Sequence, residues 1–131
     1  MRVSREEIPG VLRGTLEQKT EVLFAYLFGS FADETTFRDL DVGIFIADLR
    51  QIENTLTYTL DLSGELERRT GYPVDVILMN TAPDHLIYSI AKGMVLVDRD
   101  ENFRVDWIAQ AWKRYLDVKP KRRQAIIDMM T

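Results

Sequence analysis

The alternation of apolar and polar stretches along the chain predicts short buried strands separated by helices. Four short apolar segments, bounded by glycine, proline or charged residues, are typical of buried strands. These segments are residues 22–28, 40–46, 74–79 and 94–97. Residues 51–69 contain good helix formers and end before Gly71, which is a common C-terminal stop. The pattern therefore predicts a helical crossover between the second and third strands.

Further helices are predicted at the start of the chain and before the fourth strand. Ser4, followed by two glutamates, predicts a helix start, with Pro9 close behind it. A short helix is expected over about 84–92, where Gly93 ends it. Together these elements predict an α/β fold in which helices flank a small mixed β-sheet.

The end of the chain is predicted to form a helical tail. The pattern is helical from Glu101, Pro120 is expected to interrupt it, and a last helix runs to Met130. One face of the tail is apolar at helical spacing and is expected to pack on the core. It consists of Ile108, Ala111, Trp112, Tyr115 and Leu116.

Length and composition fit one domain that buries its own core. The 131 residues predict a single domain, with its core at about 20–98 and its C-terminal helices at about 101–130. The 46% of hydrophobic residues suffice for a core without covalent cross-links. The chain contains no cysteine and one histidine, His85, which excludes disulfides and disfavours a zinc site. We expect His85 to be a surface or capping residue.

The net charge and the lack of long apolar stretches limit the expected cellular location and the expected classes of partner. No segment approaches the roughly 20 apolar residues that a membrane-spanning helix requires, and no signal peptide is evident. We therefore expect a cytoplasmic protein without a membrane partner. A net charge of −4 disfavours broad nucleic-acid binding, which requires a basic surface.

Two aspartates stand at the start of the second strand. Asp39 and Asp41 are two residues apart, so strand alternation points them the same way, with about 7 Å between their α-carbons. Two carboxylates on the same face at the mouth of a buried strand repel each other unless a cation lies between them. The alternative is a solvated boundary between loop and strand, with turn-forming aspartates.

Two further elements are predicted to reach the same edge of the sheet. A helical crossover makes the second and third strands parallel, which brings Asp75 beside Asp39 and Asp41. The shorter connection after the first strand suits an antiparallel pair, which places Gly29 and Ser30 there as well.

This combination suits phosphoryl transfer assisted by Mg²⁺. Mg²⁺ typically binds one or two carboxylates together with substrate phosphates, and two such ions can clamp the attacking and leaving oxygens. A glycine lets backbone N–H groups approach a phosphate, and the serine hydroxyl adds a donor. Ser30 would in the simplest case only cap the turn that follows it.

In order along the chain, Gly29-Ser30-Phe31-Ala32, Asp39-Leu40-Asp41 and Asp75 resemble the motifs of the polymerase-β-like nucleotidyltransferases. Among these the chain is similar to the short MntA-type proteins, the antitoxins of HEPN/MNT toxin–antitoxin pairs. The resemblance covers about residues 20–118.

The resemblance implies a nucleotidyltransferase fold and a role for each residue of the motifs. Gly29 and Ser30 would contact the phosphates of a nucleoside triphosphate, and Asp39 and Asp41 would bind Mg²⁺, as two ions. Asp75 would complete the metal site or help to deprotonate the acceptor. The activity implied is transfer of AMP from ATP to a hydroxyl, a tyrosine of a partner HEPN toxin in the MntA-like case.

The chain departs from the family pattern between the two motifs. Eight residues separate Ser30 from Asp39, instead of the usual ten, and Asp33-Glu34 replaces a common glycine. Arg38 stands where the family often has serine, and would bind phosphate or pair with the neighbouring acids. These departures leave open a second function, in which a weakly active or inactive domain neutralises its partner by binding alone.

The last residues offer two further surfaces. The one basic cluster comprises Lys119, Lys121, Arg122 and Arg123, and we expect a solvated helix end rather than a nucleic-acid or partner contact. Four apolar residues near the end predict docking on a neighbouring helix or on a partner, and leave a homo-oligomer open. They are Ile126, Ile127, Met129 and Met130.

Overall fold

A four-stranded mixed sheet forms the centre of the protein in a computed structural model, which describes residues 2–33 and 36–130. For Asp33 and residues 118–130 only the backbone is described. The strand order is β3-β2-β1-β4. Strand β1 runs antiparallel to β2 and β4, whereas β3 runs parallel to β2. The strands are β1 (Val22–Phe28), β2 (Leu40–Ile46), β3 (Val74–Leu78) and β4 (Met94–Asp98).

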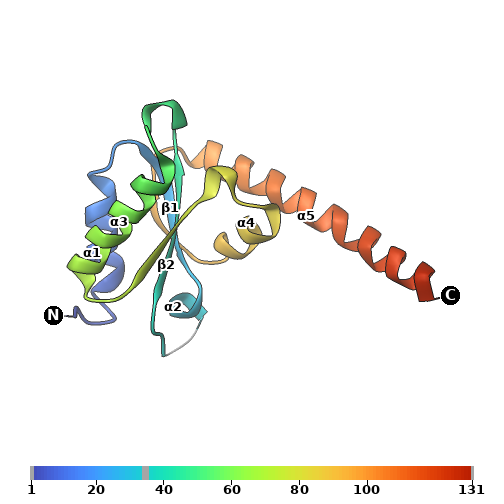
Figure 1. Ribbon diagram of the computed structural model, residues 1–131, viewed down its shortest axis with the longest axis horizontal. Helices are drawn as coiled ribbons and strands as arrows, with labels where there is room; N and C mark the ends of the chain where they lie inside the picture. The colour runs from blue at the N-terminus through green and yellow to red at the C-terminus, as the bar shows by residue number, and fades with distance from the viewer. Residues whose placement is uncertain (1, 34–35, 131) are drawn as a thin grey trace.

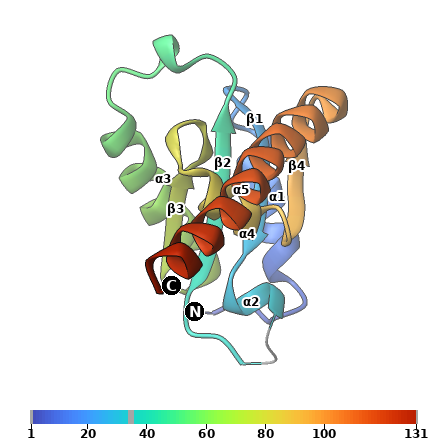
Figure 2. The same ribbon diagram turned by 90° about the vertical axis from the view of Figure 1, so that its right-hand side faces the viewer.

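Helices cover both faces of the sheet (Figures 1 and 2). One face packs against α1 (Ile8–Glu17) and α3 (Thr55–Thr70), and the other against α4 (Asp84–Ile90) and α5 (Glu101–Met130). The short helix α2 (Ser30–Asp33) follows β1 directly at one end of the sheet. Two 3₁₀ turns, Leu49–Gln51 and Met79–Thr81, complete the described elements. The expected α/β fold with a small mixed sheet is confirmed.

Alternation along the strands sends different side chains to the two faces. On β2, Leu40, Val42 and Ile44 are fully buried against α1 and α3. Phe45 packs on the opposite face, where its ring stacks on that of Phe24 at 4.8 Å. Asp41 has the same parity as Phe45, so its carboxylate lies on the α4 and α5 face of the sheet.

The helix boundaries differ from the predictions at three places. Helix α1 begins at Ile8, and a turn precedes it in which Glu7 N donates to Ser4 O at 3.0 Å and the Ser4 hydroxyl donates to the Glu7 carboxylate at 2.7 Å. Helix α3 begins at Thr55 instead of 51, because the side chain of Asn54 caps it by accepting from Thr57 N at 3.0 Å. Helix α4 ends at Ile90, two residues earlier than predicted.

Strand ends shift by one residue. Strand β3 ends at Leu78 instead of 79, because Met79 begins a 3₁₀ turn, and β4 continues to Asp98. The amide of Asn80 then accepts from Ile46 N at 2.9 Å and donates to Ile46 O at 2.8 Å, so it extends the ladder of β2 where β3 has ended.

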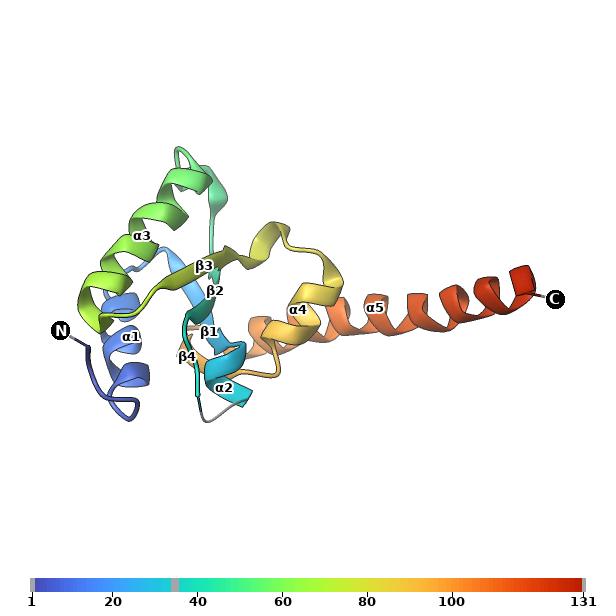
Figure 3. The ribbon, with the colours of Figure 1, turned by 60° about the horizontal axis from the view of Figure 1, so that its bottom comes forward.

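The C-terminal tail is one helix, which corrects the predicted interruption at Pro120. Helix α5 is continuous from Glu101 to Met130, and its second half extends away from the sheet (Figures 1 and 3). A proline removes one backbone hydrogen bond, and flanking lysine, arginine, glutamine and alanine favour the helix enough for it to continue. Leu116 was also placed wrongly on the apolar face, since 46% of it is exposed.

The rest of the apolar face of the tail packs as predicted. Ile108 and Ala111 are buried, and the ring of Trp112 lies 4.9 Å from that of Tyr88 on α4. The basic cluster at 119–123 and the apolar residues at 126–130 lie outside the described side chains. No helix among the described residues is long and apolar enough to span a bilayer.

Candidate active site

The three aspartates singled out in the sequence meet at one end of the sheet. Asp41 is the second residue of β2, and its Cα is paired in register with that of Asp75 on the parallel strand β3. Asp39 lies just before β2 and is exposed. The parallel pairing expected from the helical crossover is therefore confirmed, and it brings carboxylates from two strands to neighbouring positions.

Helix α4 covers the sheet up to the edge of this carboxylate group. A Cβ on Gly43, two residues beyond Asp41, would lie 2.9 Å from Ile90 Cγ2 and 3.2 Å from Met79 Cγ, so the helix packs directly on the glycine. Beyond this contact, towards the start of the strand, Asp41 is half-buried and keeps access to water. The carboxylates thus stand where the hydrophobic cover of this face ends.

Gly29 packs directly against Asp41. The antiparallel register pairs Phe28 with Asp41, so the turn that follows β1 passes over the carboxylate. Gly29 has φ +78°, and a Cβ at this position would overlap Asp41 Oδ2 and lie 3.1 Å from its Cγ. Only glycine satisfies both the backbone conformation and the close approach. The expected antiparallel pair, with Gly29 and Ser30 at the carboxylate edge, is confirmed.

Burial and charge repulsion both disfavour ionisation of Asp41. Partial burial, which is the larger cause, raises the pKa of its carboxyl above the ordinary value of 3.8, and the negative charges of Asp75 and Asp39 raise it further. A cation beside the three carboxylates would remove this repulsion. The electrostatics therefore favour a bound positive charge.

Replacing Asp41 with asparagine is expected to stabilise the protein at neutral pH. Because the folded state holds the Asp41 proton more tightly than the unfolded chain, stability falls as pH rises from 3.8 through the raised pKa, and the loss persists at higher pH. Water screens this half-exposed group, so Asp41→Asn should raise the free energy of unfolding by less than about 1 kcal/mol. This corresponds to a rise in Tm of a few degrees.

Thermal melts at pH 7 and at about pH 3.5 measure this effect. The two proteins should differ in Tm at pH 7, and the difference should shrink at the lower pH, where more than half of Asp41 is protonated even in the unfolded chain. A Tm for Asp41→Asn equal to or below that of the wild type at pH 7 would contradict the repulsion.

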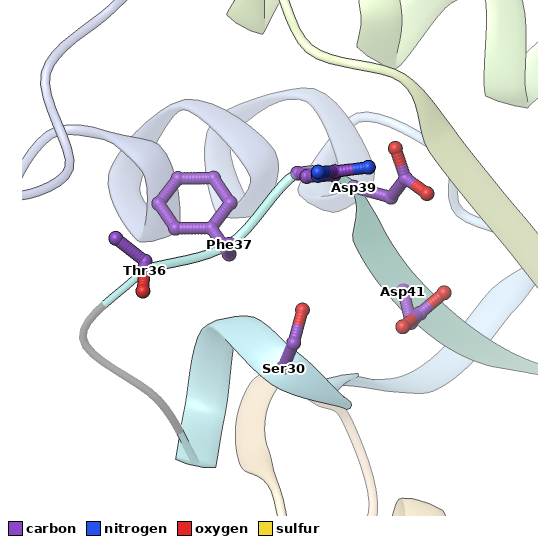
Figure 4. Close-up of a pocket in the computed structure, with 6 residues that line it drawn as sticks. Ser30, Thr36, Phe37, Asp39 and Asp41 are labelled. Atoms are coloured by element: carbon purple, nitrogen blue, oxygen red, sulfur yellow. The ribbon is translucent and has the colours of Figure 1, made fainter.

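A hollow of about 550 Å³ opens beside Asp39 and Asp41. Figure 4 shows the Ser30 hydroxyl and the two carboxylates around this space, with Thr36 and Phe37 on the loop that bounds its other side. The lining residues are Ser30, Thr36, Phe37, Arg38, Asp39 and Asp41. Asp75 is not among them. The hollow is thus acidic at the sheet and carries one arginine on its loop side.

The sequence of this region assigns the chain to a family. Residues 11–102 match the family model described as "Polymerase beta, Nucleotidyltransferase". The chain belongs to this family. The match includes Gly29, Ser30 and the three aspartates, and it confirms the resemblance to polymerase-β-like nucleotidyltransferases. No curated protein matches the chain.

Solved structures share the nucleotidyltransferase fold over nearly the whole chain. One comes from the complex of tri-AMPylated Shewanella oneidensis HEPN toxin with MNT antitoxin, with a TM-score of 0.73, 17% identity, and coverage of 98% of this chain and 100% of that one. Another comes from a toxin–antitoxin with AMP-PNP, with a TM-score of 0.69, 20% identity and coverage of 98% and 100%. At these identities the likeness concerns the fold.

The donor set of this nucleotidyltransferase domain fits Mg²⁺ held jointly with a substrate. Among the described residues, no group of three or more histidine, aspartate or glutamate side chains is placed to hold a metal ion by itself. Mg²⁺ needs only one or two carboxylates when phosphates supply further oxygens. Asp39 and Asp41, which line the same hollow, provide that pair.

Arg38 and His85, the remaining residues singled out in the sequence, are both exposed. Arg38 is exposed and lines the hollow. Its expected pairing with Asp33 or Glu34 falls outside the described side chains. His85 is exposed on α4, as expected for a surface residue. Phe37 also lines the hollow, and no motif in the sequence indicates it; its aromatic side chain within the otherwise polar stretch 33–38 is the available signal.

Proposed function

We propose that this nucleotidyltransferase domain transfers AMP from ATP to a hydroxyl of a partner protein, as the antitoxin of a HEPN/MNT-type pair. The observation that carries the proposal is the contact of Gly29 with Asp41, which is itself in register with Asp75. It joins the three separate motifs beside one hollow, which Ser30, Asp39 and Asp41 line. Phosphoryl transfer depends mostly on positioning and charge neutralisation, which such a site can provide.

Each residue of the site has a role in this proposal. The backbone at Gly29 and the Ser30 hydroxyl donate to the triphosphate, and Arg38 reaches a phosphate from the loop side. Asp39 and Asp41 hold Mg²⁺, which when bound neutralises charge on the phosphates and on the leaving pyrophosphate. Asp75 stands beside this pair and either completes the metal site or accepts the proton of the attacking hydroxyl.

The reaction balances without a further reactant. The acceptor oxygen forms a bond to the α-phosphorus of ATP, the bond from that phosphorus to the bridging oxygen breaks, and pyrophosphate leaves. The hydroxyl proton passes to Asp75 or to water. The product is an AMP ester of the acceptor.

A protein acceptor is supported by the structural neighbours of the domain. The neighbours are described as toxin–antitoxin assemblies, one of them with a tri-AMPylated HEPN toxin. A tyrosine acceptor follows the MntA-like resemblance.

Calorimetric titration of ATP into the protein, with and without Mg²⁺, tests the nucleotide half of the proposal. We expect Mg²⁺-dependent binding with a Kd between about 1 μM and 1 mM, the range in which substrate KM values commonly fall. Asp39→Asn should weaken binding with Mg²⁺ present, because it removes one carboxylate from the ion. A titration without binding heat under any of these conditions would contradict the proposal.

The second candidate function is neutralisation of the partner by contact alone. The eight-residue spacer between Ser30 and Asp39 and the missing glycine favour it. It expects a stable partner complex that survives Asp41→Ala, with no measurable binding of ATP or Mg²⁺. The same titration therefore separates the two functions.

A further inference from the structure

The loop from β1 to β2, which includes the short helix α2, carries both halves of the candidate site. Ser30 stands at one end of this loop and Asp39 at the other. Two aromatic residues on its described parts meet across it: the rings of Phe31 and Phe37 lie 4.8 Å apart in an edge-to-face arrangement. Phe31 is buried, whereas Phe37 lines the hollow (Figure 4).

One arginine from the start of the chain contacts both ends of this loop. The Arg5 guanidinium lies 4.5 Å from the centre of the Phe31 ring and 5.2 Å from that of Phe37. It also donates a hydrogen bond to Phe31 O at 2.8 Å. Arg5 therefore bridges the residue after Ser30 and the residue two positions before Asp39.

The backbone of Arg5 is itself anchored to the core. It lies in the turn that the hydroxyl of Ser4 closes on Glu7, and its carbonyl accepts from Ile8 N at 3.3 Å. Ile8 and Leu12 of α1 are fully buried against the sheet. Because the backbone of Arg5 is fixed next to the packed core, its side chain restricts the movement of the loop that it contacts.

We infer that Arg5 is a positioning residue for the nucleotide hollow, an inference that rests on the proposed function. Arg5 holds Phe31 and Phe37 together, and so fixes the distance between the Ser30 hydroxyl and the Asp39 carboxylate. It is not among the residues that line the hollow. This clamp joins Phe31 and Phe37, which lie near the two ends of the spacer.

Arg2 provides a matched control on the same segment. Its guanidinium lies 4.6 Å from the centre of the Tyr72 ring, and its Nε donates to Gly71 O at 3.1 Å. The chemistry thus matches that of Arg5, although the partner ring of Arg2, Tyr72, contacts the site loop at Phe37, with 5.0 Å between the rings. Replacing Arg2 therefore removes a comparable cation–π contact and hydrogen bond, at a position that is separated from the hollow by one more aromatic ring.

The test compares Arg5→Met, Arg5→Lys and Arg2→Met in Mg·ATP titrations and in hydrogen exchange. We expect Arg5→Met to raise the Kd for Mg·ATP about tenfold, since it removes a charged hydrogen bond and two ring contacts. Amide exchange should become faster in residues 29–33 and 36–40, with protection of the strands retained. Arg5→Lys keeps the charge and should recover part of the affinity, and Arg2→Met should change neither measurement.

Three results would overturn the inference. The first is unchanged Kd and unchanged exchange in Arg5→Met, the second is an equal effect of Arg2→Met, and the third is an increase in exchange spread evenly over the protein. If Arg5→Met does not fold, Arg5→Lys decides through the same two measurements. If the wild type binds no ATP, the proposed function fails, while the exchange comparison still decides the positioning role.

Discussion

Asp41→Ala is expected to lower the rate of nucleotidyl transfer by at least about a thousandfold, the scale associated with losing metal-assisted charge stabilisation. Asp41 combines three contacts: it packs on Gly29, pairs in register with Asp75 and lines the hollow with Asp39. In the proposed mechanism, alanine removes a carboxylate that would hold Mg²⁺ at the transferring phosphate. Single-turnover measurements of AMP incorporation into the partner, at saturating ATP, report this step.

The Tm of the Asp41→Ala protein distinguishes a loss of catalysis from a loss of folded structure. Because the pKa of Asp41 is raised by burial and by neighbouring negative charges, its removal should not lower Tm at neutral pH. Asp61→Ala is the control, since Asp61 is exposed on α3 and does not line the hollow. Transfer by Asp41→Ala within tenfold of the wild-type rate would contradict the role of this carboxylate.

Gly29→Ala is expected to impair both activity and stability. The added Cβ would overlap Asp41 Oδ2, and alanine at φ +78° is strained by about 1–3 kcal/mol. Relief of the overlap must displace either the turn that carries Ser30 or the carboxylate of Asp41. A shift of about 1 Å at a reacting group costs on the order of a hundredfold in rate.

Gly14→Ala is the matched substitution outside the site. Gly14 lies in α1, and a Cβ there would meet no atom within 4 Å. It should raise the free energy of unfolding by about 0.5–1 kcal/mol, since alanine favours a helix over glycine, and leave transfer unchanged. Chemical denaturation and transfer rates of both variants test the comparison. A fully active Gly29→Ala protein would show that the contact with Asp41 does not position the site.

The meeting of the carboxylates could be predicted from the sequence because it depends on backbone periodicity. Along residues 40–46, side chains alternate between the buried core and the face of the sheet that carries the site. A connection long enough to contain a helix makes the next strand parallel. These two rules place Asp75 beside Asp41, as the register shows. The turn at Gly29 followed from the short connection to β2.

The features that the sequence did not reveal depend on tertiary contacts. Nothing local shows that Arg5 would lie over Phe31 and Phe37, since more than twenty residues separate them and the contact forms only when α1 packs on the sheet. The continuity of α5 through Pro120 is a second case, because the penalty for proline competes with the preferences of all its neighbours. Local sequence signals predict helix boundaries poorly where the penalty for a proline and the helix preferences of its neighbours nearly balance.

Transfer of label from ATP tests the central claim most directly. The purified protein is incubated with Mg²⁺, the proposed HEPN-type partner protein, and ATP labelled either at the α-phosphate or at the γ-phosphate. The proposed reaction puts the α-label on a partner hydroxyl and releases the γ-label in pyrophosphate, and incorporation should be lost in both Asp39→Ala and Asp41→Ala. No incorporation of α-label, or incorporation of γ-label instead, would contradict nucleotidyl transfer at this site.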